Sequence, residues 1–308
     1  MDVKFVKQLT DYVNKCVLFY AQDSAHMKYF LKFLAYLRSD ISITNKVIVC
    51  GYNPESTEVR SAEEWAERNV HIVKPDERIH TPVCIDRENR IYEDRIMYDI
   101  SATDGKPESY MQYRNIGTFV EWVLRFPPCP VRFLEEHKLG KGKAEYMPDK
   151  QEIEVTRGFV SEAEVCHLIL REYAHYYIHE KHRKENEKFR YNRRTYGVDA
   201  FSVAYAICLR FGVAVPKLEN IQPDSSLQPK DILGVFDGLD YAICKVSDRI
   251  EHGPELRRAA EEKARKEKEE IEKKRRKEEK ERKEKEAKAV DPGKRPMPPE
   301  LQEVRECF

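Results

Sequence analysis

The sequence predicts an α+β fold, and three features of the 308-residue chain lead to that prediction. Apolar residues recur at helical spacing through most of the chain, whereas residues 79–85 and 95–100 are short apolar runs between polar turns, as strands are. Residues 256–290 are almost wholly Glu, Lys, Arg and Ala, which predicts a long, solvated helix. We expect two compact domains before this helix, at residues 1–126 and 130–255.

The first domain is predicted to be a mixture of helices and strands. The first forty residues contain two apolar stripes at helical spacing, so they predict two amphipathic helices. An apolar run at residues 45–50 ends in the turn residues Asn53 and Pro54, and Ser61 with Glu64 has the pattern of a capping box that begins a short helix. The remaining elements predicted here are strands at 70–73, 79–85 and 95–100 and a helix at 118–126.

The second domain is predicted to be mostly helical with one small β-hairpin. The prolines at positions 127, 128 and 130 mark the expected boundary before it. Residues 144–146 and 152–156 flank a turn at 147–151, which predicts the hairpin. Helices are predicted over 166–179, 200–211 (ended by Gly212) and 229–249.

The charged segment has the pattern of a solitary helix rather than of a coiled coil. Nine of its glutamates have Lys or Arg four residues later, the arrangement that stabilises an isolated helix. Ile271 is the only large apolar residue between Arg257 and Lys288, so there is no apolar seam for a partner helix. We expect the proline-rich residues 291–308 to be disordered.

Charge and cysteine content limit the classes of function. The chain has 55 Lys or Arg and 55 Asp or Glu, but residues 257–288 hold 16 basic and 11 acidic residues, so the rest is mildly acidic. A mildly acidic body with a basic arm gives weak support for contact with nucleic acid and none for a strongly basic DNA-binding surface. The eight cysteines are scattered without a C-x-x-C pair, which indicates reduced thiols in a cytoplasmic protein. No apolar run is long enough to span a membrane, so no membrane contact is expected.

A candidate metal motif lies in the helix predicted over residues 166–179. Glu172, His175 and His179 are at positions i, i+3 and i+7, so they share one face of this helix. In the zincin motif H-E-x-x-H, two histidines bind zinc and the glutamate between them polarises a water molecule. Here the first histidine is replaced by Arg171, whose guanidinium stays protonated and has no lone pair for a metal. Arg171 would repel the ion and could pair with Glu172 instead.

Three interpretations of this motif remain open from the residues alone. The helix could be a buried polar helix, or a vestigial site, whose histidines are only hydrogen-bonded. An active zinc peptidase would instead use His175 and His179 as ligands, with Asp199 or His167 as a further ligand and Glu172 as the general base. An interaction protein would bind an extended peptide in the cleft of a former peptidase site. The peptide would pair with the strand predicted at 152–156, which we expect to be an edge strand.

The order of these features resembles the ArdC-type antirestriction family, in its LtrC-like branch on conjugative elements. The resemblance implies an N-terminal domain that binds single-stranded DNA and a C-terminal zincin-like domain related to the ImmA/IrrE peptidases. Four segments carry it: residues 45–58 with Trp65, residues 98–107 (YDISATDGKP), the hairpin at 144–155, and residues 200–212.

The departures from that family pattern concern the zinc ligands. The third ligand of the family aligns with Phe201 or Gly197, and neither side chain can bind zinc. With Arg171 in place of the first ligand, two of three ligands are missing. We therefore predict a non-catalytic pseudopeptidase of a mobile element with no cofactor, in which zinc would be bound only if the ligands are rearranged.

The resemblance also places a candidate DNA-binding surface. The basic turn of the family aligns with residues 73–79 (VKPDERI), in which both of its glycines are absent. DNA phosphates would be contacted by Arg60, Arg68, Lys74 and Arg78, or these cations form only a solvated rim; Trp65 is expected in the core. The expected partner is DNA, single-stranded rather than duplex, with a host or element protein at the zincin-like cleft as the alternative.

Overall fold

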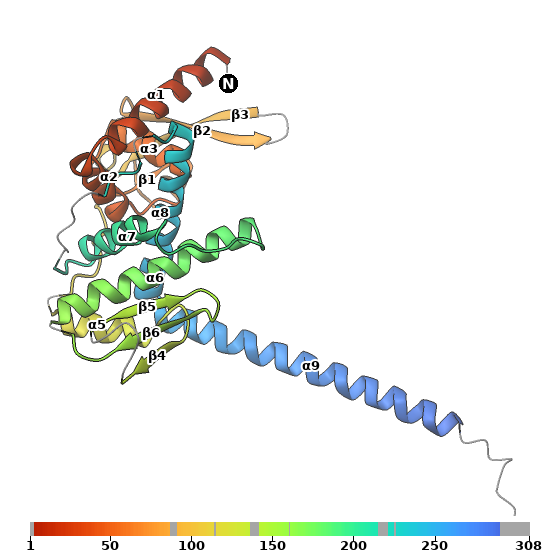
Figure 1. The fold of residues 1–308 in the computed structure, drawn as a ribbon. Helices are drawn as coiled ribbons and strands as arrows, with labels where there is room; N and C mark the ends of the chain where they lie inside the picture. The colour runs from red at the N-terminus through yellow and green to blue at the C-terminus, as the bar shows by residue number, and fades with distance from the viewer. Residues whose placement is uncertain are drawn as a thin grey trace, which may run out of the picture. The chain divides into compact units, whose positions relative to one another are not determined.

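The computed structural model confirms the α+β class (Figure 1). The chain divides into two compact units, Met1–Gly253 and Pro254–Phe308. The structure describes residues 3–86, 91–113, 115–135, 142–159, 161–214, 221–224 and 226–289.

Three helices form the beginning of the first unit: α1 (Val3–Ala21), α2 (Ser24–Tyr36) and α3 (Ile43–Tyr52). The two predicted amphipathic helices are thus confirmed, and the apolar run that follows them forms α3. Asp23 begins α2, since its side chain accepts hydrogen bonds from the backbone N–H groups of the first turn.

The first sheet has the strand order β1-β3-β2 and is antiparallel throughout. Its strands are β1 (Val59–Arg60), β2 (Arg78–Asp86) and β3 (Ile91–Asp99). Between β1 and β2 lies α4 (Ala62–Glu67), which begins with the predicted capping box of Ser61 and Glu64. The indole N–H of Trp65 donates to the Tyr98 carbonyl at 3.0 Å and the ring is buried, as expected for a core residue.

The strand predicted at residues 70–73 is wrong. This segment has only an isolated bridge between Ile72 and Thr103. The Val70 N–H closes a turn on the Trp65 carbonyl, and the Val73 N–H donates to the Ala102 carbonyl beside that single bridge, so no continuous ladder forms.

The second sheet has the order β4-β6-β5. The predicted hairpin is confirmed as β5 (Ala144–Met147) paired antiparallel with β6 (Glu152–Thr156), and β4 (Val131–Leu134) pairs parallel with β6 on its other side. Since β6 is the central strand, the prediction that residues 152–156 offer a free sheet edge to a peptide is wrong. The sequence pattern of β6 could not show this, because the pairing with β4 is long-range.

Helix α6 (Glu162–Glu185) is the central element of the first unit (Figure 1). It packs against α5 (Ile116–Arg125), α7 (Gly197–Arg210), α8 (Pro229–Glu251) and strand β5. The predicted helices at 118–126, 200–211 and 229–249 are thereby confirmed. The turn after α7 contains Gly212 at φ +65°, a left-handed conformation that favours glycine.

Helices on both sides of the proline cluster share one buried core. Phe30 of α2 and Phe236 of α8 have ring centroids 4.6 Å apart, and the phenol of Tyr36 donates to the Leu209 carbonyl at 3.0 Å. The division of this unit into domains at 1–126 and 130–255 stays a prediction.

The second unit contains α9 (Gly253–Ala289), as predicted for the charged segment. Its side chains form ion pairs along its own surface, such as Arg276 with Glu272 at 2.6 Å and Lys266 with Glu262 at 2.8 Å. Ile271 is exposed, which agrees with the absence of an apolar seam. The predicted disordered tail at 291–308 lies outside the described residues. In the described parts of the chain, the longer helices carry too much charge and too little apolar sequence to cross a bilayer.

A buried ion pair links α3 to α8 and provides a test of this shared core. The Lys46 ammonium lies 2.8 Å from both carboxylate oxygens of Asp240, and only 5% of the Lys46 side chain is exposed. Asp240→Ala leaves the ammonium buried without its partner, so we expect a loss of about 3–5 kcal/mol in the free energy of unfolding. Urea denaturation measures this loss.

The matched control is the double variant Lys46→Met/Asp240→Leu, which removes both charges. We expect it to recover most of the stability, since two packed apolar side chains do not carry the desolvation cost. A single variant as stable as the wild type would show that the pair is open to water in solution.

Candidate functional site

Helix α6 brings the three predicted site residues to one buried face. Ser161 caps its N-terminus by accepting a hydrogen bond from the Glu164 N–H. The exposed fractions are 0% for Glu172, 1% for His175 and 7% for His179, so all three lie in the interior. The helical spacing therefore predicted the shared face correctly, but the structure places this face in a packed core.

The Glu172 carboxylate is surrounded by donors. The Arg171 Nε donates to Oε1 at 3.0 Å, which confirms the predicted pairing of these neighbours. Arg193 adds a bidentate pair, with Nη2 at 2.6 Å from Oε1 and Nη1 in close contact with Oε2. The Tyr146 N–H of strand β5 donates to Oε2 at 2.8 Å.

These contacts decide the charge state of Glu172. Burial acts to raise the pKa of its carboxyl group, but the bonds and charge of Arg193 outweigh it, so the pKa lies below its usual value. For Arg193, burial acts to lower the pKa and the bond to Glu172 more than compensates, so its pKa is raised. Both groups are therefore charged at neutral pH, and they form a desolvated ion pair.

The two histidines are hydrogen-bonded to tyrosine hydroxyls. His175 Nδ1 lies 2.5 Å from the Tyr191 hydroxyl, and His179 Nδ1 lies 2.9 Å from the Tyr146 hydroxyl. Burial lowers the pKa of His175 to about 3, against a smaller opposing effect of Glu172, and burial also lowers the pKa of His179. Both imidazoles are therefore neutral at physiological pH, and one nitrogen of each is already bonded within the protein.

Residues 186–196, the loop between α6 and α7, cover this face. Two of their aromatic rings pack on α6: Phe189 stacks on His182 with centroids 4.7 Å apart, and Tyr191 lies against His179 at 5.0 Å. Within the loop, Tyr191 also stacks on Tyr196 at 5.2 Å. The cavity beside His179 and Tyr146 measures about 10 Å³, which is at the lower limit for one water molecule. The described part of this face is thus closed by the chain's own side chains.

The residues present do not fit a catalytic zinc ion. Arg171 stands at the first ligand position of the motif, and its guanidinium lies 5.0 Å from the centre of the Phe201 ring. Phe201 is one of the two positions, with Gly197, that the resemblance aligns with the third ligand. Asp199 is half-buried in the first turn of α7, where burial raises its pKa to about 6, and His167 bonds to the Ala214 carbonyl. Within the described residues, no three His, Cys, Asp or Glu side chains converge as metal ligands. A rearranged site of His175 and His179 thus lacks a third ligand there.

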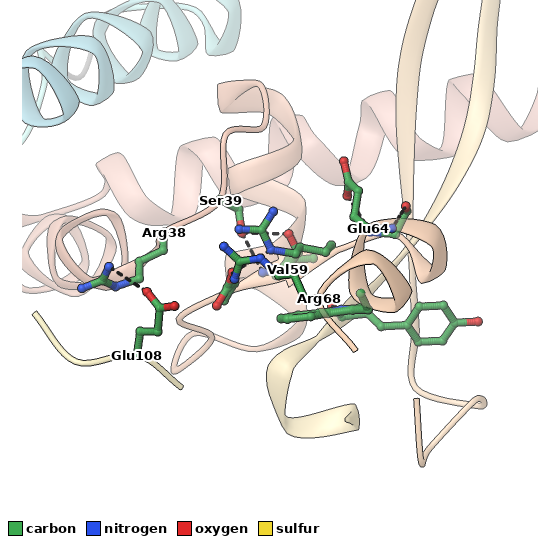
Figure 2. Close-up of polar contacts among 11 residues, drawn as sticks. Arg38, Ser39, Val59, Glu64, Arg68 and Glu108 are labelled. Carbon is green, nitrogen blue, oxygen red and sulfur yellow. Dashed lines mark hydrogen bonds and ion pairs between the residues drawn. The ribbon is translucent and has the colours of Figure 1, made fainter. Parts of the chain in front are cut away.

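The predicted DNA-contacting cations lie near β1, the end of α4 and the turn before β2. Arg60 Nε and Arg68 Nη1 lie 2.6 Å and 2.8 Å from the same oxygen of Glu58, which is buried. Figure 2 shows Arg68 beside Val59, whose N–H and carbonyl both bond to the Ser39 hydroxyl.

The other two cations have weaker partners. Lys74 is exposed and lies 3.1 Å from Glu77, while Arg78 Nε donates to the Pro75 carbonyl at 3.2 Å. Two of the four predicted residues thus share the buried carboxylate of Glu58, and the other two lie in the exposed turn at residues 74–78.

Sequence reasoning missed Arg193, Tyr191 and Tyr146, which complete the cluster around α6. Arg193 lies in a basic stretch with several other cations, and nothing in the pattern distinguishes the one that folds back onto Glu172. The available signal was Glu172 itself on the packed face of the helix, since a buried carboxylate requires more donors than the one neighbour Arg171 supplies. That signal indicates a partner but not its position.

The solved structures that resemble this chain include two structures of one protein. No family model matches the sequence, and no curated protein matches it. The Mn(II)-bound crystal structure of the antirestriction protein ArdC from plasmid R388 is 14% identical, with a TM-score of 0.44 over 82% of this chain and 98% of that chain. Its metal-free structure is also 14% identical, with a TM-score of 0.39 over 69% and 86%. The ArdC-type resemblance, its LtrC-like branch and the zincin-like domain stay predictions.

The neutral His175 predicts a pH dependence of stability. In the unfolded chain this imidazole takes up a proton near its ordinary pKa of 6.5, whereas in the folded chain it stays neutral to about pH 3. Between these values the unfolded state binds more protons, so the free energy of unfolding falls as the pH falls. We expect His175→Gln, which cannot titrate, to reduce this slope by about 1.4 kcal/mol per pH unit between pH 6 and pH 5.

Chemical denaturation at several pH values measures the slope. His252→Gln is the control, because it removes an exposed imidazole. An unchanged slope in His175→Gln would show that His175 is protonated in the folded protein.

Proposed function

We propose that this protein is a non-catalytic, antirestriction-type DNA-binding protein of a mobile element, of the LtrC-like kind, whose α6 helix belongs to a pseudopeptidase domain. The observation that supports the non-catalytic part is the state of Glu172. Its carboxylate is fully buried and bonded to Arg171, Arg193 and the Tyr146 N–H.

A general base must have a free lone pair within reach of a water molecule or substrate. Both oxygens of Glu172 accept hydrogen bonds from protein donors, and the lowered pKa makes the carboxylate a weaker base. Releasing it would break a buried ion pair, which costs about 3–5 kcal/mol when one charge is left unpaired. Arg193 thus supplies inside the protein the positive charge that a metal supplies in a peptidase.

The DNA-binding part is supported by the charges near β1 and β2. Two guanidiniums, Arg60 and Arg68, share the single carboxylate of Glu58, so this group keeps a net positive charge. The Lys74–Glu77 pair is half-exposed, and such pairs contribute little stability, so a phosphate can compete for the ammonium. A local cationic edge on a mildly acidic body suits a flexible single strand, which can follow separate contacts, better than a rigid duplex.

Zinc content tests the non-catalytic part. We expect less than about a tenth of an equivalent of zinc in the purified protein, because three ligands are typical of a catalytic site and the described residues do not supply them. Elemental analysis measures this, with His175→Ala as the control. Near one equivalent in the wild type, lost in His175→Ala, would support the rearranged peptidase with His175 and His179 as ligands.

Salt-dependent binding of a fluorescent single-stranded oligonucleotide tests the DNA part. We expect Lys74→Glu/Arg78→Glu to weaken binding and to reduce the slope of log K against log salt by about 1.4, since each lost phosphate contact contributes about 0.7. Lys188→Glu/Arg190→Glu carries the same charge change on exposed residues of the 186–196 loop. Equal losses in both variants, or tighter binding of a duplex of the same length, would contradict the predicted site.

A further inference from the structure

A second hollow, which no part of the proposed function uses, lies between the first helix and the first sheet. We call it the α1–hairpin cavity, and its volume is about 790 Å³. Its walls come from α1, residues 40–45, the β2–β3 hairpin and the beginning of α8, whose places are seen in Figure 1. This volume falls within the roughly 300–1,000 Å³ that is typical of small-molecule sites.

The walls of the α1–hairpin cavity are mainly apolar. Val6 and Leu9 of α1, Val83 of β2 and Leu233 of α8 line it while being only partly buried, and Met97 of β3 closes it from the core. Apolar side chains that line a cavity make fewer dispersion contacts than side chains in a packed core, and their surface stays exposed to water. An apolar group of suitable size in this space would recover both contributions.

Asn45 supplies a polar feature at the wall of the cavity. It is 5% exposed, and its Nδ2 donates to the Pro82 carbonyl at 3.3 Å. Because the Pro82 carbonyl can only accept, the amide nitrogen of Asn45 must face it, and the amide oxygen Oδ1 faces away from Pro82. Oδ1 has no hydrogen-bond partner in the described structure. This acceptor can take a hydrogen bond from a water molecule in the cavity, so the polar part of the wall can stay hydrated beside an apolar tail.

The rim of the cavity favours a negative charge. Two exposed cations, Arg95 and Lys230, stand there against one carboxylate, Asp40. Lys230 lies in the first turn of the 23-residue helix α8, whose N-cap residue Gln228 makes no side-chain capping bond. Pro229 has no N–H and the Asp231 N–H bonds to the Gln228 carbonyl, so the helix adds the partial positive end of its dipole, rather than a set of free N–H groups, next to Lys230.

We propose that the α1–hairpin cavity binds an amphipathic carboxylate with a single apolar tail, of the fatty-acid type. The tail lies among Val6, Leu9, Val83 and Leu233, and the carboxylate lies at the rim beside Lys230 and Arg95. This proposal is independent of DNA binding and of the state of Glu172, since none of its residues belongs to either site.

Binding of decanoate to the full chain tests the proposal by titration calorimetry, with decylamine as the probe of opposite charge. We expect decanoate to bind and to displace the fluorescent anion 1-anilinonaphthalene-8-sulfonate, with weaker binding of decylamine. Lys230→Glu is expected to weaken decanoate about ten-fold and to strengthen decylamine, because it reverses one rim charge. An acid in the first turn also suits the helix dipole, so this variant should fold normally.

Leu233→Trp fills the cavity and should weaken both probes about ten-fold. Lys277→Glu on α9 is the matched charge control and should change neither affinity. Equal binding of decanoate and decylamine, or a Lys230→Glu variant with unchanged affinities, would overturn the proposal. A stable dimer that binds neither probe would assign the apolar walls to a second copy of the chain and would also overturn it.

Discussion

The ion pair of Glu172 with Arg193 is the constraint on which the centre of this structure depends. A carboxylate with no exposed surface is stable only when charged donors replace water, since desolvation of a lone charge costs several kcal/mol. Glu172 lies on α6, which contacts α5, α7, α8 and β5. Its donors come from the same helix, from β5 and from the 186–196 loop, so the charge ties three separate segments together.

The same constraint explains why this face is closed. Once Arg193 is committed to Glu172, the loop that carries it must lie over α6, and Tyr191 is then brought to His175 at 2.5 Å. The tyrosine and histidine bonds satisfy polar atoms that would otherwise be buried without partners. A site of this kind is well suited to stability and specificity of packing, and poorly suited to substrate entry. Two cations stand at this motif: Arg171 at the position of a first metal ligand, and Arg193 on the carboxylate of Glu172.

Buried cations also hold the beginning of the chain to its later helices. Arg210, at the end of α7, donates to the Ala35 carbonyl at 2.6 Å and to the Leu34 carbonyl at 3.2 Å, where α2 ends. Its positive charge complements the negative end of that helix and its unsatisfied carbonyls. Together with the Lys46–Asp240 pair, this contact joins segments on either side of the proline cluster. The α1–hairpin cavity lies beside this joint, where α1 and the hairpin leave apolar side chains only partly covered.

The sequence by itself determined the local structure. Apolar periodicity located the long helices, the Ser61–Glu64 pattern marked the beginning of α4, and the turn at 147–151 predicted the β5–β6 hairpin, because each depends on residues close in the chain. It also showed that Arg171 cannot bind a metal, which is a property of the side chain alone. Only the tertiary structure decided that Arg193 pairs with Glu172, that β4 makes β6 a central strand, and that Asp40, Asn45, Arg95 and Lys230 meet around one cavity. These depend on how distant segments return to one another, which no local pattern encodes.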